Sequence, residues 1–146
     1  MRYRERVTPR ISSFLPLLLL LPAGWLTTAM FEPALGLAIG AAVAVVVAAA
    51  MVYFSTVITI DDEKIFVGPA NIGIKNLGKC ESFSGKEAFQ ERGPRLNAKA
   101  YVQFQPSLQQ LVKIEIKDAT DPTPYWLFST RYPEEILRLL GKKQTS

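Results

Sequence analysis

The chain has 146 residues, 49% of them hydrophobic, and 17 basic against 13 acidic side chains give it a net charge of +4. It contains no histidine and one cysteine. An intrachain disulfide is therefore excluded, and the commonest general base and a frequent metal ligand are missing. Part of the positive charge lies in a short basic arm, residues 1–10, and no clustered basic face of the nucleic-acid-binding kind follows it. We expect no nucleic-acid partner and no cofactor.

An apolar run extends from Ile11 to Phe54, with Glu32 as its one charged side chain. A helix needs roughly 20 residues to cross a hydrocarbon core of about 30 Å, and residues 14–31 and 34–54 each have about that length. The run therefore predicts a two-helix transmembrane hairpin over residues 11–54. A buried hairpin in a soluble protein fits less well, because few residues remain to cover it. A cleaved signal peptide also fits less well, because a second span follows at once.

The charges that flank the two spans predict their orientation. Four arginines precede the first span, Lys64, Lys75 and Lys79 follow the second, and the turn between the spans carries only Glu32. Basic residues are enriched on the cytoplasmic side of spans, so both termini are expected in the cytoplasm of a multi-pass protein of the cell (plasma) membrane. The solitary cysteine agrees with a reducing compartment.

Each span has a packing feature of its own. Pro22 is expected to bend the first span, because it removes a backbone hydrogen bond. In the second span, small residues recur every four positions and form a stripe that lets helices approach closely. The stripe packs either against the first span or against a second copy of the chain. It consists of Gly36, Gly40, Ala44 and Ala48.

Beyond Phe54 the hydrophobic period changes from helical to alternating, which predicts a small, mainly β soluble domain over residues 55–146. Residues 84–99 are polar and predict a long loop. Pro133 begins a helix that buries Ile136 and Leu140, and Gly141 ends it. The expected strands cover residues 57–60, 64–67, 70–77, 80–83, 101–105, 112–116 and 125–130.

Six or seven short antiparallel strands closed by a C-terminal helix are the plan of a pleckstrin-homology-like barrel. The segment from Val57 to Gly78 resembles the opening of bacterial pleckstrin-homology-like domains that follow two membrane spans. The whole chain also resembles an uncharacterised actinobacterial family of two-span membrane proteins, which has no assigned activity. That resemblance rests on Tyr3-Arg4-Glu5-Arg6, on Asp121-Pro122-Thr123-Pro124-Tyr125-Trp126, and on Ser129-Thr130-Arg131 with Pro133.

Catalytic chemistry is not expected from these residues. Cys80 has no imidazole partner and fits a small core side chain. The acidic turn, residues 61–63, lacks the ligand spacing of a calcium loop. Gly68, Gly73 and Gly78 punctuate strands rather than form a phosphate-binding loop. We therefore expect a protein that is not an enzyme and has no metal site.

Two sets of residues are candidates for binding. Asp121 and Arg131 flank Tyr125 and Trp126, and this segment is a candidate docking edge for a peptide strand. The acidic turn argues against recognition of a phosphate headgroup beside it, which leaves the polar loop as the candidate anionic contact. The basic residues of that loop are Lys86, Arg92, Arg95 and Lys99.

Two functions of different class follow. The first is a non-enzymatic integral membrane protein that presents an interaction module at the cytoplasmic membrane surface, for a protein partner or for self-association. The second is a sensor of anionic lipid or of a small ligand at the inner leaflet. The lipid bilayer is a partner in both.

Overall fold

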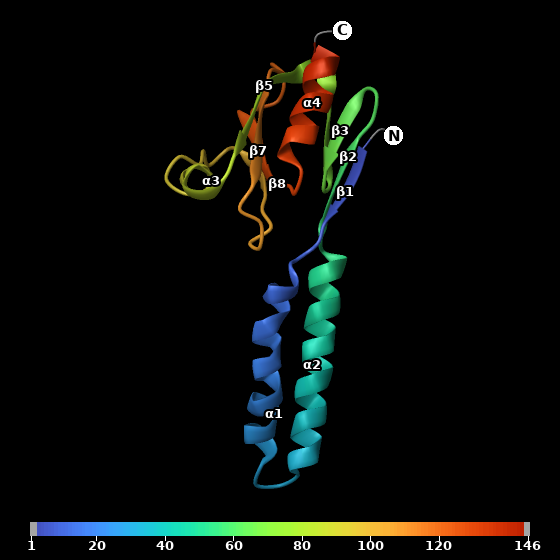
Figure 1. Ribbon diagram of the computed structural model, residues 1–146, viewed down its shortest axis with the longest axis vertical. Coiled ribbons are helices and arrows are strands. Elements are labelled where there is room, and N and C mark those ends of the chain that lie inside the picture. Colours follow the sequence, from blue (N-terminus) through green and yellow to red (C-terminus); the bar gives the residue numbers. More distant parts are fainter. Residues whose placement is uncertain (1–2, 145–146) are drawn as a thin grey trace. The chain divides into compact units, whose positions relative to one another are not determined.

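The computed structural model describes residues 3–144 (Figure 1), so Arg2 of the basic arm lies outside it. The chain divides into two compact units. One is helical and runs from Thr8 to Ser55. The other combines the N-terminal strand with everything from Thr56 onward.

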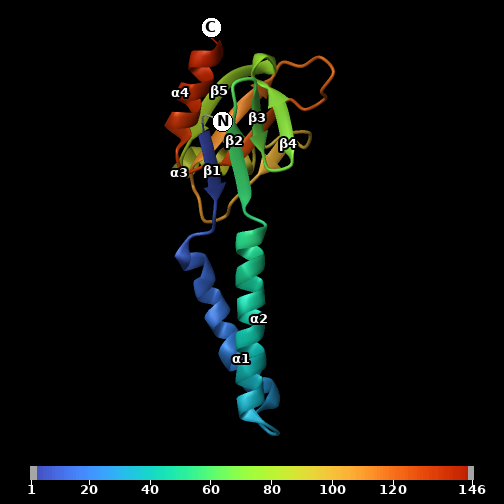
Figure 2. The ribbon, with the colours of Figure 1, turned by 90° about the vertical axis from the view of Figure 1, so that its right-hand side faces the viewer.

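The helical unit is an antiparallel hairpin (Figure 2). A 3₁₀ segment, η1 (Ile11–Leu19), continues into α1 (Leu20–Thr28), and α2 (Pro33–Tyr53) returns. Pro33 occupies the first turn of α2, where a backbone N–H has no intrahelical partner. Pro22 likewise lies in the first turn of α1, so it interrupts no ladder there. The chain changes from 3₁₀ to α geometry just before Pro22, and the bend predicted there stays a prediction.

Glycines set the distance between the two helices. A Cβ atom added at Gly36 would lie 2.0 Å from Thr28 Oγ1 and 2.3 Å from the carbonyl oxygen of Gly24. One added at Gly40 would lie 2.4 Å from the carbonyl oxygen of Leu20. Only glycine allows backbones to approach this closely. The glycine half of the predicted stripe therefore packs within the hairpin.

The outward faces of the hairpin are apolar. Leu18, Val45 and Val46 are each at least 60% exposed. Segments Ile11–Thr28 and Pro33–Tyr53, with 18 and 21 residues, are long and apolar enough to cross a membrane. The sequence placed the first of these three residues later, at 14–31.

The other unit contains two four-stranded sheets. The first is antiparallel and follows chain order: β1 (Tyr3–Val7), β2 (Thr56–Ile60), β3 (Lys64–Val67) and β4 (Ala70–Gly73). The second has the order β5 (Leu77–Phe83), β7 (Leu111–Ile116), β8 (Tyr125–Ser129) and β6 (Tyr101–Gln103). A 3₁₀ turn, η2 (Ile74–Asn76), joins the sheets.

The prediction of a closed antiparallel barrel is wrong. The described residues form two separate sheets, and β6 runs parallel to β8. The cause lies in β8, where all five residues are buried. A strand that is apolar on both faces is stable only when covered on both faces. Strand β8 lies between β6 and β7 in the second sheet.

The main core lies between the two sheets and α4 (Pro133–Gln144), as Figures 1 and 2 show. Ile58 and Ile65 come from the first sheet, Ile114 and Phe128 from the second, and all are fully buried. The buried face of α4 completes the core with Ile136 and Leu140, as the sequence predicted. The helix continues to Gln144, so the prediction that Gly141 ends it is wrong.

The polar loop predicted over residues 84–99 instead begins as a helix, α3 (Gly85–Arg92). Ala88 is fully buried in a second, smaller core with Leu111, Tyr125 and Leu127. Glu91 is also buried, and its carboxylate pairs with Lys113 Nζ at 3.0 Å. The polar composition of this short helix and the Gly93-Pro94 pair after it favoured a loop in the sequence.

Candidate functional site

The N-terminal arm is a strand held by a buried carboxylate. Residues Tyr3–Val7 form β1, in which Val7 pairs with Thr56 of β2. Glu5 is 6% exposed and accepts hydrogen bonds from the hydroxyls of Tyr3 at 2.9 Å and Thr130 at 2.5 Å. The backbone N–H of Arg131 donates to its second oxygen at 2.8 Å.

We call this arrangement the Glu5 latch. It brings together two sequence motifs, Tyr3-Arg4-Glu5-Arg6 and Ser129-Thr130-Arg131, that lie at opposite ends of the chain. Burial and the hydrogen bond to Glu5 raise the pKa of Tyr3, so its phenol stays protonated and donates. The latch fixes β1 at the edge of the first sheet rather than leaving a free arm.

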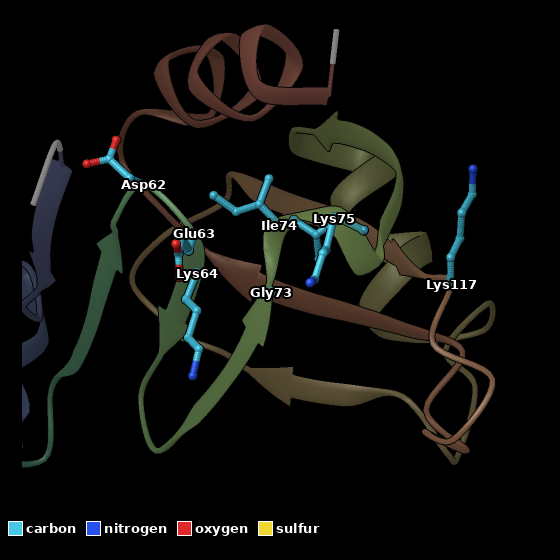
Figure 3. Close-up of a pocket in the computed structure, with 8 residues that line it drawn as sticks. Asp62, Glu63, Lys64, Gly73, Ile74, Lys75 and Lys117 are labelled. Carbon is cyan, nitrogen blue, oxygen red and sulfur yellow. The ribbon is translucent and has the colours of Figure 1, made fainter. Parts of the chain in front are cut away.

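A cavity lies where the first sheet meets η2 and the end of β7. It has a volume of about 870 Å³ and is lined by Lys64, Lys75 and Lys117, among others. In Figure 3, Lys64 and Lys75 extend in the same general direction and Lys117 stands at the far end. No ion pair of these three lysines is found in the described part of the chain. We call this cavity the lysine pocket.

Two carboxylates accompany the lysines. Asp62 and Glu63 of the acidic turn line the same pocket. The loop on the opposite side is held by Asn76, whose amide donates to Asp118 at 3.1 Å. Hydrogen bonds from Thr120 lower the pKa of Asp118, which stays ionised as their acceptor. Three amines and two acids therefore line the pocket, with the Lys117 amine pointing the opposite way from those of Lys64 and Lys75 (Figure 3).

The second cavity, of about 420 Å³, is a groove at the starts of α3 and α4. Carboxylates line it from both helices, and Tyr132 is 56% exposed at its edge. We call it the acidic groove. Its lining residues are Ser82, Phe83, Ser84, Glu87, Gln110, Arg131, Tyr132, Pro133, Glu134 and Glu135.

Comparison with known proteins places the chain. A family model described as a protein of unknown function (DUF3093) matches residues 2–140. The chain belongs to the DUF3093 family. No curated protein and no solved structure gives a significant match. Membership of DUF3093 confirms the coarser prediction, that the chain belongs to a family of unknown function.

The predicted docking residues occupy different environments in this DUF3093 chain. Tyr125 and Trp126 are 9% and 4% exposed. Their strand, β8, is paired on both sides, so it offers no open edge for strand addition. Asp121 accepts the backbone N–H of Thr123 at 2.9 Å, as expected of a turn residue. Arg131 lines the acidic groove.

The four predicted anionic contacts lie on α3 and the loop after it. Lys86 and Lys99 are exposed. Arg95 pairs with Glu91 at 3.5 Å. Arg92 is half-buried, at the end of α3. None of the four lines the lysine pocket or the acidic groove.

Only part of the small-residue stripe is buried in the contact between the two helices. Gly36 and Gly40 are buried against the first helix, whereas Ala44 and Ala48 are half-buried. Sequence reasoning missed Gly24, which meets both glycines across the interface. The sequence did contain a signal for it, because Gly24 and Thr28 are small residues four positions apart, the spacing that defined the stripe in the second span.

Proposed function

We propose that this chain is a non-enzymatic, membrane-anchored binding module. The observation that carries the anchor is the hairpin surface, where side chains such as Val45 and Val46 are about two-thirds exposed. Exposed apolar surface of this extent is unfavourable in water and favourable in lipid. Because glycines form the contact between the helices, the large apolar side chains point outward, where they would contact the bilayer.

Strand pairing supports a single side for both flanks of the hairpin. Val7, just before the first helix, pairs with Thr56, just after the second. Two residues paired in one sheet lie on the same side of a membrane. The basic residues in both flanks make that side the cytoplasm in this proposal, at the cell membrane. We also keep a pleckstrin-homology-like plan for the β unit as part of the proposal.

The absence of enzyme activity is likewise proposed from residue chemistry. The chain has no histidine. Burial raises the pKa of Cys80 to about 11, so its thiol is protonated near neutral pH and is a poor nucleophile. We propose that the β unit binds a protein partner or a second copy of the chain.

Crosslinking tests this function. The full chain, extracted from membranes with and without prior crosslinking, should co-purify with one defined partner or with itself in the crosslinked sample only. A chain that resists alkaline carbonate extraction but yields neither product would contradict the binding role. A chain released by carbonate would contradict the anchor. The full chain is needed, because a fragment from Ser55 onward lacks β1 and the Glu5 latch.

The lysine pocket favours a second candidate, the sensing of a small anion or an anionic lipid headgroup. Three amines with no ion pair among the described residues attract phosphate or carboxylate groups. The full chain in nanodiscs of neutral lipid, titrated with inorganic phosphate, tests the soluble source; nanodiscs of anionic lipid test the headgroup. Replacing Lys64, Lys75 and Lys117 by Ala should abolish a response that the same change at exposed Lys86 and Lys99 leaves intact. No response in either lipid would exclude the sensor.

A further inference from the structure

The acidic groove has a one-sided charge. Glu87 contributes a carboxylate from the first turn of α3, and Glu134 and Glu135 contribute two from the first turn of α4. The guanidinium of Arg131 is the only cationic group among the lining residues. The groove therefore carries a net negative charge, whereas the whole chain is positive.

Helix electrostatics explain only part of this arrangement. Acidic residues in a first turn are stabilised by the helix dipole, and Glu134 accepts a hydrogen bond from Ser82 Oγ at 3.4 Å. The dipole does not require an aromatic ring in the lining of the groove. Yet Tyr132 stands there with more than half of its surface exposed, and Phe83 lines the groove from the end of β5.

Carboxylates beside one exposed aromatic ring match the chemistry of a basic side chain. A guanidinium or ammonium group pairs with carboxylates and also stacks on aromatic faces. The cavity volume of about 420 Å³ lies within the range of ligand pockets, roughly 300–1,000 Å³. A long basic side chain with its neighbouring residues fits such a space.

We propose that the acidic groove binds an arginine- or lysine-bearing segment of a partner protein. The proposal rests on the binding function above and assigns it a place and a partner chemistry. The basic side chain lies between Glu87 and the two glutamates of α4, with its planar end or its stem against Tyr132. The groove backbone is preorganised, because Glu5 fixes the N–H of Arg131.

Peptide binding tests the assignment. The full chain in neutral nanodiscs is titrated with a fluorescent peptide in which arginine alternates with leucine, and with the same peptide carrying citrulline, the neutral analogue of arginine. Binding of the arginine peptide well above the citrulline peptide is expected. Equal binding of the two, or none, would overturn the proposal.

Two triple variants separate the groove from overall charge. E87Q/E134Q/E135Q removes three carboxylates from the groove. D61N/E81Q/E115Q removes three carboxylates that line neither the lysine pocket nor the acidic groove and is the matched control. We expect about a tenfold loss of affinity in the first and less than about a twofold loss in the second. Equal losses would show that the peptide responds to net charge alone and would overturn the proposal.

Y132A gives a test without any change of charge. The ring is largely exposed, so the variant should fold, which its thermal unfolding temperature checks. A weaker affinity for the arginine peptide supports binding at the acidic groove. An unchanged affinity would contradict the proposed contact between the basic side chain and Tyr132. If the peptide fails to bind while crosslinking still captures a partner, the groove assignment falls and the proposed function stands.

Discussion

The Glu5 latch gives the sharpest prediction about stability. In Glu5→Ala, three donors lose their acceptor: the hydroxyls of Tyr3 and Thr130 and the backbone N–H of Arg131. Thr130 is fully buried, so water cannot readily replace the carboxylate there. We expect β1 to detach more easily and the β unit to lose stability.

The size of the loss follows from these bonds. A hydrogen bond to a charged group contributes about 1.5–3 kcal/mol, and an unsatisfied buried donor costs about 1–3 kcal/mol. The Tyr3 hydroxyl is half-buried and recovers part of its bond from water. We therefore expect Glu5→Ala to cost about 3–5 kcal/mol of unfolding free energy, a large share of the roughly 5–15 kcal/mol of a typical domain. Glu5→Gln keeps one acceptor oxygen and should cost about 1–2 kcal/mol.

Tryptophan fluorescence in a urea titration measures this loss. The chain has two tryptophans, so Trp25→Phe leaves Trp126, which is buried in the main core, as the reporter. Arg4→Ala, on the exposed side of the same strand, is the matched control. A Glu5→Ala midpoint equal to that of Arg4→Ala would refute the reasoning, because the carboxylate would then contribute nothing beyond the strand itself.

Three further predictions concern packing, an ion pair and pH. Gly36→Leu should separate the two helices, because a Cβ there meets Thr28 Oγ1 at 2.0 Å; spin-label distances across the hairpin should lengthen, whereas exposed Ala38→Leu should leave them unchanged. Lys113→Ala leaves the buried Glu91 carboxylate with only the longer ion pair to Arg95. The variant should lose about 2–4 kcal/mol of unfolding free energy and show faster amide exchange in α3. Unchanged exchange would contradict the role of the Glu91–Lys113 pair. Burial raises the pKa of Cys80 from 9.0 to about 11, so its thiol ionises first in the unfolded chain. The contribution of the protonated thiol to the free energy of unfolding is complete below pH 9 and is lost as pH rises toward 11. Between pH 9 and 11 the stability of Cys80→Ala should therefore fall less than that of the unmodified chain. Parallel stability curves for the two proteins would refute this.

Local patterns predicted much of the fold. The apolar run predicted both helices of the hairpin, because its length and composition fit two membrane-spanning helices. Alternation located most strands, and the spacing of Ile136 and Leu140 gave α4. These features depend on residues that are close in sequence.

Features that depend on distant residues were missed. Tyr3–Val7 looks like a basic arm until Thr130 and Arg131 supply partners for Glu5. In the sequence, the acidic turn beside Lys64 argued against an anion site. Lys75 and Lys117 are distant in sequence and line the same pocket as Lys64 only in the folded chain. The position of β8 between β6 and β7 likewise depends on contacts between segments far apart in the sequence, and two separate sheets replace the predicted barrel.

Cysteine labelling of the hairpin turn tests the central claim most directly. The full chain with Cys80→Ser receives one new cysteine, either at Glu32 in the turn or at exposed Asp62 in the β unit. A membrane-impermeant maleimide applied to intact cells should label position 32 alone, and position 62 only after permeabilisation. Labelling of both positions in intact cells, or of position 62 alone, would contradict a hairpin that crosses the membrane with both flanks in the cytoplasm.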